Sequence, residues 1–312
     1  MNILVIGLGS IATKHIAAIN RLSGGKANIY ALRSRRDAPG RDGVTSLYDA
    51  EEAEAIDFDF AIVASPTSHH AEALLMLSRR NIPIMIEKPV LDRPDCSGLV
   101  ERLEHDRLTY VACNLRFLDA LRFVKERVDT DTMPSPVNEI NVYCGSSLPS
   151  WRPGADWRSC YSAIPELGGG VHLDLIHEID YLCWIFGLPE TSRAVCRSKS
   201  TLGIRAIDYA NYCLVYPRFC ASVILNYYRP GYKRTMEIVM GRDIWTVDIA
   251  ANRITDADGV MVFESGQRIA DTYLSQMEYF MNLTDRGARH SINGIALAND
   301  ILKIVTDYEL SE

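Results

Sequence analysis

The chain has 312 residues, 47% of them hydrophobic and 23% charged, which is ordinary for a globular protein and long enough for two domains. The formal net charge of -7 and the pI near 5.6 argue against a nucleic-acid surface, which needs clustered Lys and Arg. No apolar run approaches the roughly 18 residues of a membrane span. We therefore expect neither a nucleic-acid partner nor membrane contact.

The eight cysteines are scattered and form no CxxC pair, and most stand in apolar surroundings, as Cys183 and Cys213 do. The N-terminal segment MNILVIGLGS has no basic region ahead of its apolar residues, so it does not resemble a signal peptide. These features together predict buried, reduced thiols in a cytoplasmic protein.

The first third of the chain alternates short apolar runs with amphipathic segments. Helix periodicity occurs, for example, at 68–80 and 92–106. Strands buried on both faces are predicted at 3–7, 28–32, 60–64, 82–87 and 109–113. This alternation predicts an α/β fold with a doubly wound parallel sheet, a Rossmann-type domain over residues 1–118.

The pattern changes after residue 118. A helix is predicted at 119–128, a strand at 137–145, and then a loop rich in Pro, Trp and Arg leads to a helix in GGGVHLDLIHEID (168–180). Helices at 272–286 and 293–308 close the chain, and the last can pack back on the first domain. Clustered strands without intervening helices are predicted at 193–200, 206–216, 219–228, 235–240 and 244–249. They predict a second α/β domain, 119–312, with an open and mainly antiparallel sheet.

A glycine-rich turn follows the first predicted strand and opens a helix. Its sequence fits GxGxxA and consists of Gly7, Leu8, Gly9, Ser10, Ile11 and Ala12. The first glycine permits the tight turn, the second lets backbone amides approach a pyrophosphate, and the small Ala12 allows close helix packing. In this position the turn predicts dinucleotide binding.

The second strand ends in YALRSRR, without the Asp or Glu that usually binds the ribose 2′-hydroxyl of NAD. Arg33, Ser34 and Arg35 are the residues in reach of that position. A guanidinium there favours a 2′-phosphate, so we expect NADP to be preferred over NAD. The alternative is that these arginines are simply solvated.

Further stretches resemble the Gfo/Idh/MocA oxidoreductases, in order along essentially the whole chain. They are AIVASPTSHHAEAL (61–74), IMIEKPV (84–90), CNLRF (113–117), DWRSCYSAIPELGGGVHLDLIHEIDYLCWIFG (156–187) and YLSQMEYFMNLTDRG (273–287). The most specific is the Glu-Lys-Pro motif of the second stretch. In the first, the resemblance implies cofactor contacts from Ser65, Pro66, Thr67 and His70, with Thr67 standing where the family usually has Asn.

The resemblance also implies a tightly held nicotinamide cofactor and hydride transfer to or from a carbon of a sugar, cyclitol or nucleotide-linked sugar. An open sheet in the second domain often forms the oligomer interface in this family. We therefore expect a homodimer or a homotetramer. A sensor that binds NAD(P) without turnover, or an enzyme that uses the cofactor without net redox change, remains an alternative.

Lys88 lies at the end of a predicted parallel strand, where ligands bind in open α/β sheets. Partial burial can lower the proton affinity of a lysine and so suit it to acid–base work. Glu87 could hold the ammonium in place, next to the cofactor. Family members typically have a cis peptide before the proline, here Lys88–Pro89, which would aim the lysine inward.

Asp174 and His177 are three residues apart on one predicted helix and therefore project from the same face. His177 is expected to exchange a proton with a substrate hydroxyl, and Asp174 to orient it or to bind substrate. The interpretation places both toward the space between the domains, with Lys88 as polariser or relay. Many relatives space the pair four apart, which leaves the alignment of Asp174 open.

His172, Asp174 and His177 could also be metal ligands, but positions 172 and 177 point apart around a helix and no other Cys or His cluster joins them. We expect no metal. By family position, the resemblance implies substrate contacts from Arg116, Trp157 and Arg158, although a structural loop with Trp anchors is as plausible. The glycines 168–170 are expected to let the helix start approach bound substrate or nicotinamide. His172 is interpreted as a packed or partly exposed residue, and the histidines interpreted as surface residues are His15, His69 and His290.

Overall fold

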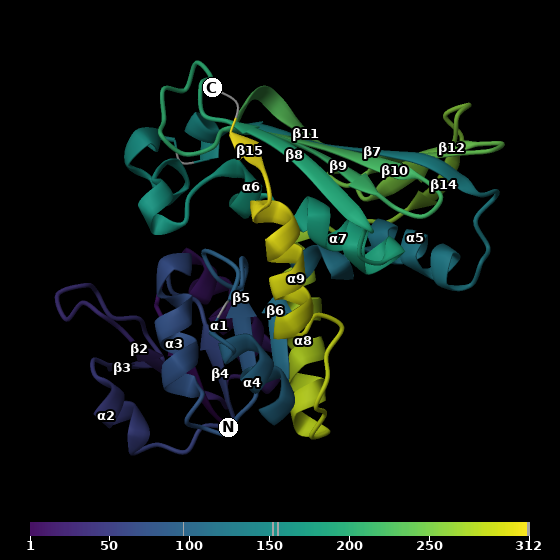
Figure 1. The fold of residues 1–312 in the computed structure, drawn as a ribbon. Helices are drawn as coiled ribbons and strands as arrows, with labels where there is room; N and C mark the ends of the chain where they lie inside the picture. The colour runs from purple at the N-terminus through teal and green to yellow at the C-terminus, as the bar shows by residue number, and fades with distance from the viewer. Residues whose placement is uncertain (96, 152, 155, 311–312) are drawn as a thin grey trace. The chain divides into compact units, whose positions relative to one another are not determined.

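The structure, a computed structural model, describes residues 1–95, 97–151, 153–154 and 156–310. Its contacts divide the chain into two compact units. Unit 1 consists of Met1–Cys113 and Tyr273–Asp300, and unit 2 consists of Asn114–Thr272 and the residues from Ile301 onward. Both units are α/β, as Figure 1 shows.

Unit 1 is built on a six-stranded parallel sheet in the order β3-β2-β1-β4-β5-β6. Its strands are β1 (Asn2–Ile6), β2 (Asn28–Leu32), β3 (Val44–Leu47), β4 (Phe60–Val63), β5 (Ile84–Glu87) and β6 (Thr109–Ala112). All residues of β4, β5 and β6 are buried, as the continuous apolar runs predict for a sheet covered on both faces. The doubly wound parallel sheet is confirmed. β3, an edge strand whose VTSL sequence is half polar, was not predicted.

Four helices of unit 1 connect these strands: α1 (Ser10–Ser23), α2 (Ala50–Glu54), α3 (His70–Leu77) and α4 (Leu99–Asp106). The buried residues of α1 follow helical spacing, with Ala12, Ile16 and Ile19 among them. The helix ends at Gly24, whose φ of 61° is in the left-handed region that a glycine tolerates.

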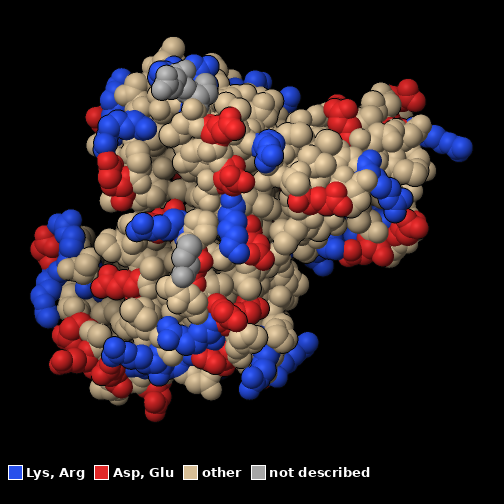
Figure 2. All heavy atoms as spheres, viewed as in Figure 1, with Lys and Arg blue, Asp and Glu red and all other residues tan. Residues whose placement is uncertain are grey.

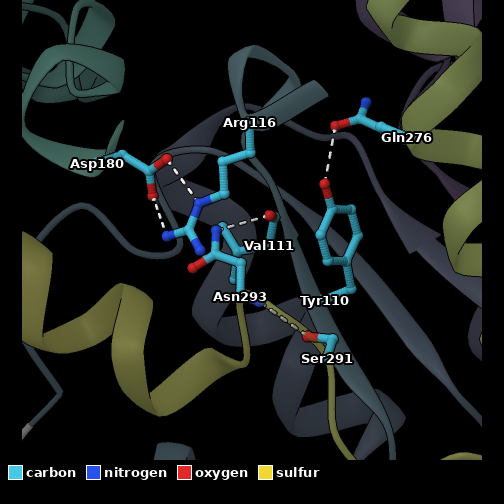
Figure 3. A network of polar contacts seen from close by, with 7 residues as sticks. All are labelled: Tyr110, Val111, Arg116, Asp180, Gln276, Ser291 and Asn293. Atoms are coloured by element: carbon cyan, nitrogen blue, oxygen red, sulfur yellow. Dashed lines mark hydrogen bonds and ion pairs between the residues drawn. The ribbon is translucent and has the colours of Figure 1, made fainter. Parts of the chain in front are cut away.

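The C-terminal part of unit 1 packs against β6. It contains α8 (Thr272–Asp285) from Tyr273 onward and the start of α9 (Ile295–Thr306). The Tyr110 hydroxyl donates to Gln276 over 3.2 Å, and the Asn293 side chain donates to the Val111 carbonyl over 2.8 Å (Figure 3). These hydrogen bonds satisfy polar groups in the interior, so this segment completes the covering of the β6 side of the sheet.

Unit 2 contains a nine-stranded sheet in the order β14-β13-β12-β11-β7-β10-β9-β8-β15. The strands are β7 (Val137–Ser147), β8 (Thr191–Arg197), β9 (Tyr209–Val215), β10 (Cys220–Asn226), β11 (Tyr228–Met240), β12 (Ile244–Asp248), β13 (Arg253–Thr255), β14 (Met261–Glu264) and β15 (Glu309–Leu310). Neighbours are antiparallel except for the pairs β7–β10 and β8–β15. The mainly antiparallel sheet is therefore confirmed, and the short β13, β14 and β15 were not predicted.

One face of this sheet is buried and the other is exposed. Along β9, for example, Ala210, Tyr212 and Leu214 are buried while the residues between them are exposed. The helices α5 (Asp119–Asp129), α6 (Val171–Asp174) and α7 (His177–Phe186) lie on one side of the sheet (Figure 1). The alternation of exposed and buried side chains is what a sheet covered on one face requires.

The helix predicted in GGGVHLDLIHEID is interrupted, which corrects the sequence interpretation. α6 ends at Asp174 and α7 begins at His177, with Leu175 and Ile176 between them. Three backbone hydrogen bonds across this junction span only three residues: Ile176 to Leu173, Glu178 to Leu175 and Ile179 to Ile176. This is 3₁₀ bonding, which winds the chain more tightly than an α-helix.

The surface of each unit carries both signs of charge, which are interspersed on the face shown in Figure 2. Of the seven described cysteines, all free, Cys213 and Cys220 are exposed. The expectation that Cys213 is buried is therefore wrong, because it lies on the exposed face of β9. Among the described helices, none is both long enough and apolar enough to cross a membrane.

Candidate active site

The turn after β1 contains two glycines, and the physical reason for having glycine differs between the two positions. Gly7 has a φ of 89°, and a Cβ on it would lie 2.8 Å from the Cα of Ser65, so the protein itself requires glycine there. Gly9 has a φ of -85°, and a Cβ on it would meet nothing within 4 Å. Neither its backbone nor its neighbours require glycine. A ligand that approaches this backbone closely is a reason that fits.

The amino end of α1 suits an anionic group. Its first-turn amides, from Ser10 to Ala12, have no acceptor within the helix, no side chain caps the helix, and no acidic residue stands in its first turn. Ala12 is fully buried, which agrees with the small residue expected for close packing. Backbone amides at a positive helix end fit the pyrophosphate of a dinucleotide.

The turn follows β1, and β1 and β4 are neighbours at the point where the strand order of the sheet reverses. β1 pairs with β2 on one side and with β4 on the other, so the loops after β1 and β4 meet at one edge of the sheet. Ligands of open α/β sheets bind at such a reversal, outside the carboxyl ends of the strands. The structure thus brings the Gly7 turn together with Ser65, Pro66 and Thr67, the residues predicted to contact the cofactor.

His70 stands in the interior of unit 1, with 1% of its surface exposed. Its Nδ1 lies 3.1 Å from the carbonyl oxygen of Val90, and its Nε2 lies 3.0 Å from that of Ser65. Burial lowers the pKa of His70, and hydrogen bonds to these carbonyls act against that shift. The side chain therefore connects the loop after β4 to the loop after β5, which supports the cofactor-side loops from within.

At the end of β2, the three predicted residues differ in their surroundings. Arg33 is 9% exposed and donates to Ser46 and to the carbonyls of Ala38 and Pro39, at 2.9–3.1 Å. Ser34 and Arg35 are exposed, and Arg35 pairs with Asp37 at 2.8 Å. The guanidinium of Arg33 thus holds its own loop, whereas Ser34 and Arg35 remain accessible.

Lys88 is the only residue between Ile84 and Leu91 that is not buried. The peptide bond between Lys88 and Pro89 is cis, as the resemblance implied. The carboxylate of Glu87 accepts the backbone N–H of Lys88 over 3.2 Å. Lys88 thus lies, partly exposed, at the carboxyl end of a buried parallel strand, and the loop of Ser65 follows the neighbouring strand β4.

His15 contacts Glu87, and this contact was not predicted. His15 was interpreted as a surface residue, yet it is fully buried, and its Nε2 lies 2.5 Å from Glu87 Oε1. The reason is its place on α1, three residues after Ala12 and four before Ile19, on the face that packs against the sheet. That helical spacing was present in the sequence and could have identified the buried position.

In unit 2, the glycines before α6 are required by the protein itself. A Cβ on Gly169 would lie 2.3 Å from the carbonyl oxygen of Tyr161 and 2.7 Å from that of Ile164. Gly168 and Gly170 have φ values of 84° and 138°. The turns at 161–167 therefore account for glycine at 169, and the positive φ values account for glycine at 168 and 170. That these glycines also let the helix start approach substrate stays a prediction.

Asp174 and His177 share one accessible face. They are the only two residues between Gly168 and Cys183 that are not buried. In 3₁₀ geometry the residues i and i+3 eclipse one another, so the three-residue hydrogen bonds of this junction favour a common side for Asp174 and His177. The three-residue spacing is therefore matched by a locally tighter helix.

The Asp174 carboxylate accepts a hydrogen bond from Tyr227. The tyrosine hydroxyl donates to Asp174 Oδ2 over 2.5 Å, and its ring lies edge-on to Trp151 with centroids 5.4 Å apart. Burial, and next the neighbouring carboxylate, raise the pKa of Tyr227 well above its usual value. Tyr227 therefore remains a neutral donor. The sequence offered no signal for this contact, because 53 residues separate the partners.

His172 is 5% exposed and packs edge-on to Tyr308, and burial lowers its pKa to about 4. It is a packed neutral residue, in keeping with the sequence interpretation. Within the described residues, no group of three or more His, Cys, Asp or Glu side chains could hold a metal ion.

The predicted substrate contacts are placed differently. Arg116 is 1% exposed and forms a two-point ion pair with Asp180, at 2.9 and 2.7 Å (Figure 3). This geometry supports an internal role in linking the segment before α5 to α7. Arg158 is exposed and its guanidinium lies 4.2 Å above the ring of Trp157. These two residues form a stacked pair at the surface of unit 2.

Two family models match the chain. Residues 1–112 match the NAD-binding Rossmann fold of the Gfo/Idh/MocA oxidoreductase family, and residues 137–228 match the C-terminal alpha/beta domain of the same family. Inositol 2-dehydrogenase of Streptomyces avermitilis is 26% identical over 213 residues, which cover 64% of this chain and 57% of that protein. The rhizopine catabolism protein MocA of Rhizobium meliloti is 24% identical over 208 residues, 63% of this chain and 61% of the relative. The chain thus aligns with little more than half the length of these relatives.

Solved structures show the same fold over nearly the whole chain. Levoglucosan dehydrogenase in complex with NADH superposes with a TM-score of 0.85 at 15% identity, covering 98% of this chain and 95% of the other. UDP-N-acetylglucosamine 3-dehydrogenase from Acidithiobacillus ferrooxidans gives 0.77 at 15% identity, with coverage of 99% and 96%. With both domain models matched in order on the predicted architecture, the chain belongs to the Gfo/Idh/MocA oxidoreductase family.

Proposed function

We propose that the chain is an NAD(P)-dependent dehydrogenase or reductase acting on a hydroxyl or keto carbon of a sugar-like substrate. One observation carries this proposal: Asp174 and His177, a carboxylate and an imidazole three residues apart, are the only side chains of residues 168–183 that are not buried. A residue pair of this kind suits proton transfer to and from a hydroxyl. The Gly7–Ala12 turn and the loop at Ser65 provide a site whose geometry fits the cofactor.

His177 is proposed as the proton partner of the reacting hydroxyl. Asp174, held by Tyr227, orients His177 or accepts a neighbouring hydroxyl of the substrate. Lys88 is proposed, from the resemblance to the family, as a polariser or relay in proton transfer. A bound nicotinamide supplies the carbon that exchanges a hydride with the substrate.

The substrate class is proposed to be a sugar, a cyclitol or a nucleotide-linked sugar. The relatives include an inositol 2-dehydrogenase, and the structural neighbours include dehydrogenases of levoglucosan and of UDP-N-acetylglucosamine. The stacked Trp157 and Arg158 offer an aromatic face and a guanidinium, which suit a sugar ring and a phosphate.

NADP is proposed as the preferred cofactor, with NAD as the alternative. The end of β2 carries no carboxylate before Asp37, and Ser34 and Arg35 are accessible there. Since the guanidinium of Arg33 is engaged by its own loop, Arg35 is the better candidate to bind a 2′-phosphate. Its pairing with Asp37 would have to yield to the phosphate.

A spectroscopic experiment tests the proposal. The purified protein is supplied with NAD or NADP, and the absorbance of the reduced nicotinamide is followed while cyclitols, sugars and sugar nucleotides are added. A lasting change supports a dehydrogenase, and a change that returns to the start indicates transient use of the cofactor. Binding of cofactor without any change across the whole panel contradicts the proposal and favours a sensor.

We also propose that the chain forms a homodimer or homotetramer through the exposed face of the unit 2 sheet. That face includes Val195, which is 43% exposed, and the side chains of Asn211 and Cys213 on the neighbouring strand. Light scattering coupled to size exclusion measures the mass directly. Val195→Lys, which places charge on the face, is expected to shift the assembly toward monomer.

A location in the cytoplasm is proposed from the cysteine chemistry. The seven described cysteines are free thiols, and four of them are buried. Reduced thiols are typical of cytosolic proteins. Titration of thiols in the protein taken directly from lysed cells, with alkylation before lysis, tests this point.

A further inference from the structure

His15 and Glu87 form a buried contact that the proposed function does not use. We propose that His15 is a positioning residue for Lys88, acting through the carboxylate of Glu87. This inference rests on the proposed function for its kinetic consequences, because Lys88 is assigned there to proton transfer. The structural part concerns unit 1 alone.

The contact connects two elements that serve the cofactor site. His15 lies on α1, one turn beyond the first-turn amides, and Glu87 is the last residue of β5. Glu87 Oε1 lies 2.5 Å from His15 Nε2, and Glu87 Oε2 accepts the backbone N–H of Lys88 over 3.2 Å. One carboxylate thus joins the helix that begins at the glycine turn to the backbone from which Lys88 projects.

Burial disfavours breaking the contact between His15 and Glu87. Glu87 is 7% exposed and His15 is fully buried, so neither side chain can exchange its partner for bulk water. A buried carboxylate without hydrogen-bond donors is strongly disfavoured, and its contact with an imidazole N–H is charge-assisted and short. Without His15, Glu87 would have to take up a proton or rotate. Either change alters the acceptor that fixes the Lys88 backbone.

The surroundings of His15 include an aromatic ring and a lysine. Its ring lies edge-on to Tyr273, with centroids 6.5 Å apart, and Lys14 Nζ stands 4.4 Å from the centroid of the same tyrosine. The charge of Glu87 also acts on His70 of α3, where it raises the pKa against the larger lowering by burial. The titratable neighbours of the pair therefore include Lys14, Tyr273, His70 and Lys88, and Glu87 is the acidic member among these.

The experiment compares His15→Leu and His15→Gln with wild type and with His105→Gln, a control at an exposed histidine of α4 in the same unit. Four quantities are measured: kcat, the pH dependence of kcat, the dissociation constant of the cofactor from nicotinamide fluorescence, and Tm. We expect His15→Leu to lower kcat ~10-fold and to shift the pH profile, with cofactor affinity within ~3-fold of wild type. His15→Gln keeps an N–H donor for Glu87 and should recover part of the rate.

A merely structural role predicts a different result. Equal losses in kcat and cofactor affinity together with a lower Tm, and with the pH profile unchanged, would overturn the proposal. Wild-type kcat and pH profile in His15→Leu would overturn it as well.

A readout without turnover separates this inference from the proposed function. Reductive 13C-methylation of the lysines gives each side chain an NMR signal, and Lys88→Arg identifies the signal of Lys88. Its titration is expected to move in His15→Leu and to stay in place in His105→Gln. If the wild-type protein turns over no substrate, the proposed function fails, and this titration still decides whether His15 acts on Lys88. An unmoved Lys88 titration contradicts the proposal.

Discussion

The hydroxyl of Tyr227 lies 2.5 Å from a carboxylate oxygen of Asp174, and Tyr227 itself is fully buried. The tyrosine stands between β10 and β11, so the unit 2 sheet fixes a side chain at the end of the short helix α6. Four residues are too few for a helix to hold its own geometry. The sheet therefore sets the orientation of Asp174, and with it the accessible face that Asp174 shares with His177.

Tyr227→Phe should release Asp174 while leaving the fold in place. Loss of one buried hydrogen bond costs about 1 kcal/mol of unfolding free energy, and kcat should fall ~10-fold because the carboxylate is no longer oriented. Steady-state kinetics and denaturant unfolding check both effects. Tyr212→Phe is the matched control, since its buried hydroxyl donates to the Val305 carbonyl in the same unit. Similar losses of kcat in both variants would contradict a specific role for Tyr227.

Removal of the proposed proton-transfer groups should affect turnover rather than cofactor binding. His177→Ala and Lys88→Ala are each expected to lose a factor on the order of 10² or more in kcat, because general acid–base groups contribute on that scale. Cofactor fluorescence titration should give a dissociation constant close to that of wild type. A double variant with full activity would remove both residues from the mechanism.

The two glycines of the first turn should separate stability from binding. Gly7→Ala brings a Cβ to 2.8 Å from the Ser65 backbone at a φ of 89°, so it should lower both Tm and cofactor affinity. Gly9→Ala meets no protein atom within 4 Å, so Tm should stay near the wild-type value while cofactor affinity falls. Thermal unfolding with and without NAD(P) measures both. Undiminished cofactor binding by Gly9→Ala would place the dinucleotide elsewhere.

Cofactor choice should depend on Arg35 more than on Arg33. Arg35→Ala removes the accessible guanidinium and should lower the NADP/NAD ratio of kcat/KM. Arg33→Ala removes hydrogen bonds to Ala38, Pro39 and Ser46 and should act first on Tm. An NADP/NAD ratio unaltered in both variants rules out this end of β2 as the selector.

His172 should make the protein less stable in mild acid. Burial lowers its pKa from 6.5 to about 4 in the folded state, so the unfolded chain binds the proton more tightly. The stabilisation from this group is full above pH 6.5 and is lost as the pH falls toward 4. His172→Phe keeps a ring against Tyr308 and should flatten that part of the stability profile, measured by urea unfolding at several pH values. An exposed-site control, His105→Phe, should retain the wild-type slope.

Much of the candidate site could be predicted from local sequence patterns. Gly7 to Ala12, the Lys88 strand end and the pair Asp174 and His177 all follow from motif position and from runs of buried residues. The errors have local causes too. His15 was misplaced because a polar residue on the packed face of a helix looks like a surface residue when its partner is far away. The single helix at 168–180 was wrong because apolar periodicity does not reveal 3₁₀ bonding.

The sequence by itself determined most of the strands and helices, the parallel sheet of unit 1 and the mainly antiparallel sheet of unit 2. These depend on periodicity and burial, which neighbouring residues encode. Only the tertiary structure decided the partners of the polar side chains: Glu87 for His15, Tyr227 for Asp174, Asp180 for Arg116. Each of these pairs joins residues at least 53 positions apart. Such contacts carry no local signal in the sequence. They form because folding removes water from these polar groups, and each buried group then needs a hydrogen-bond partner within the protein.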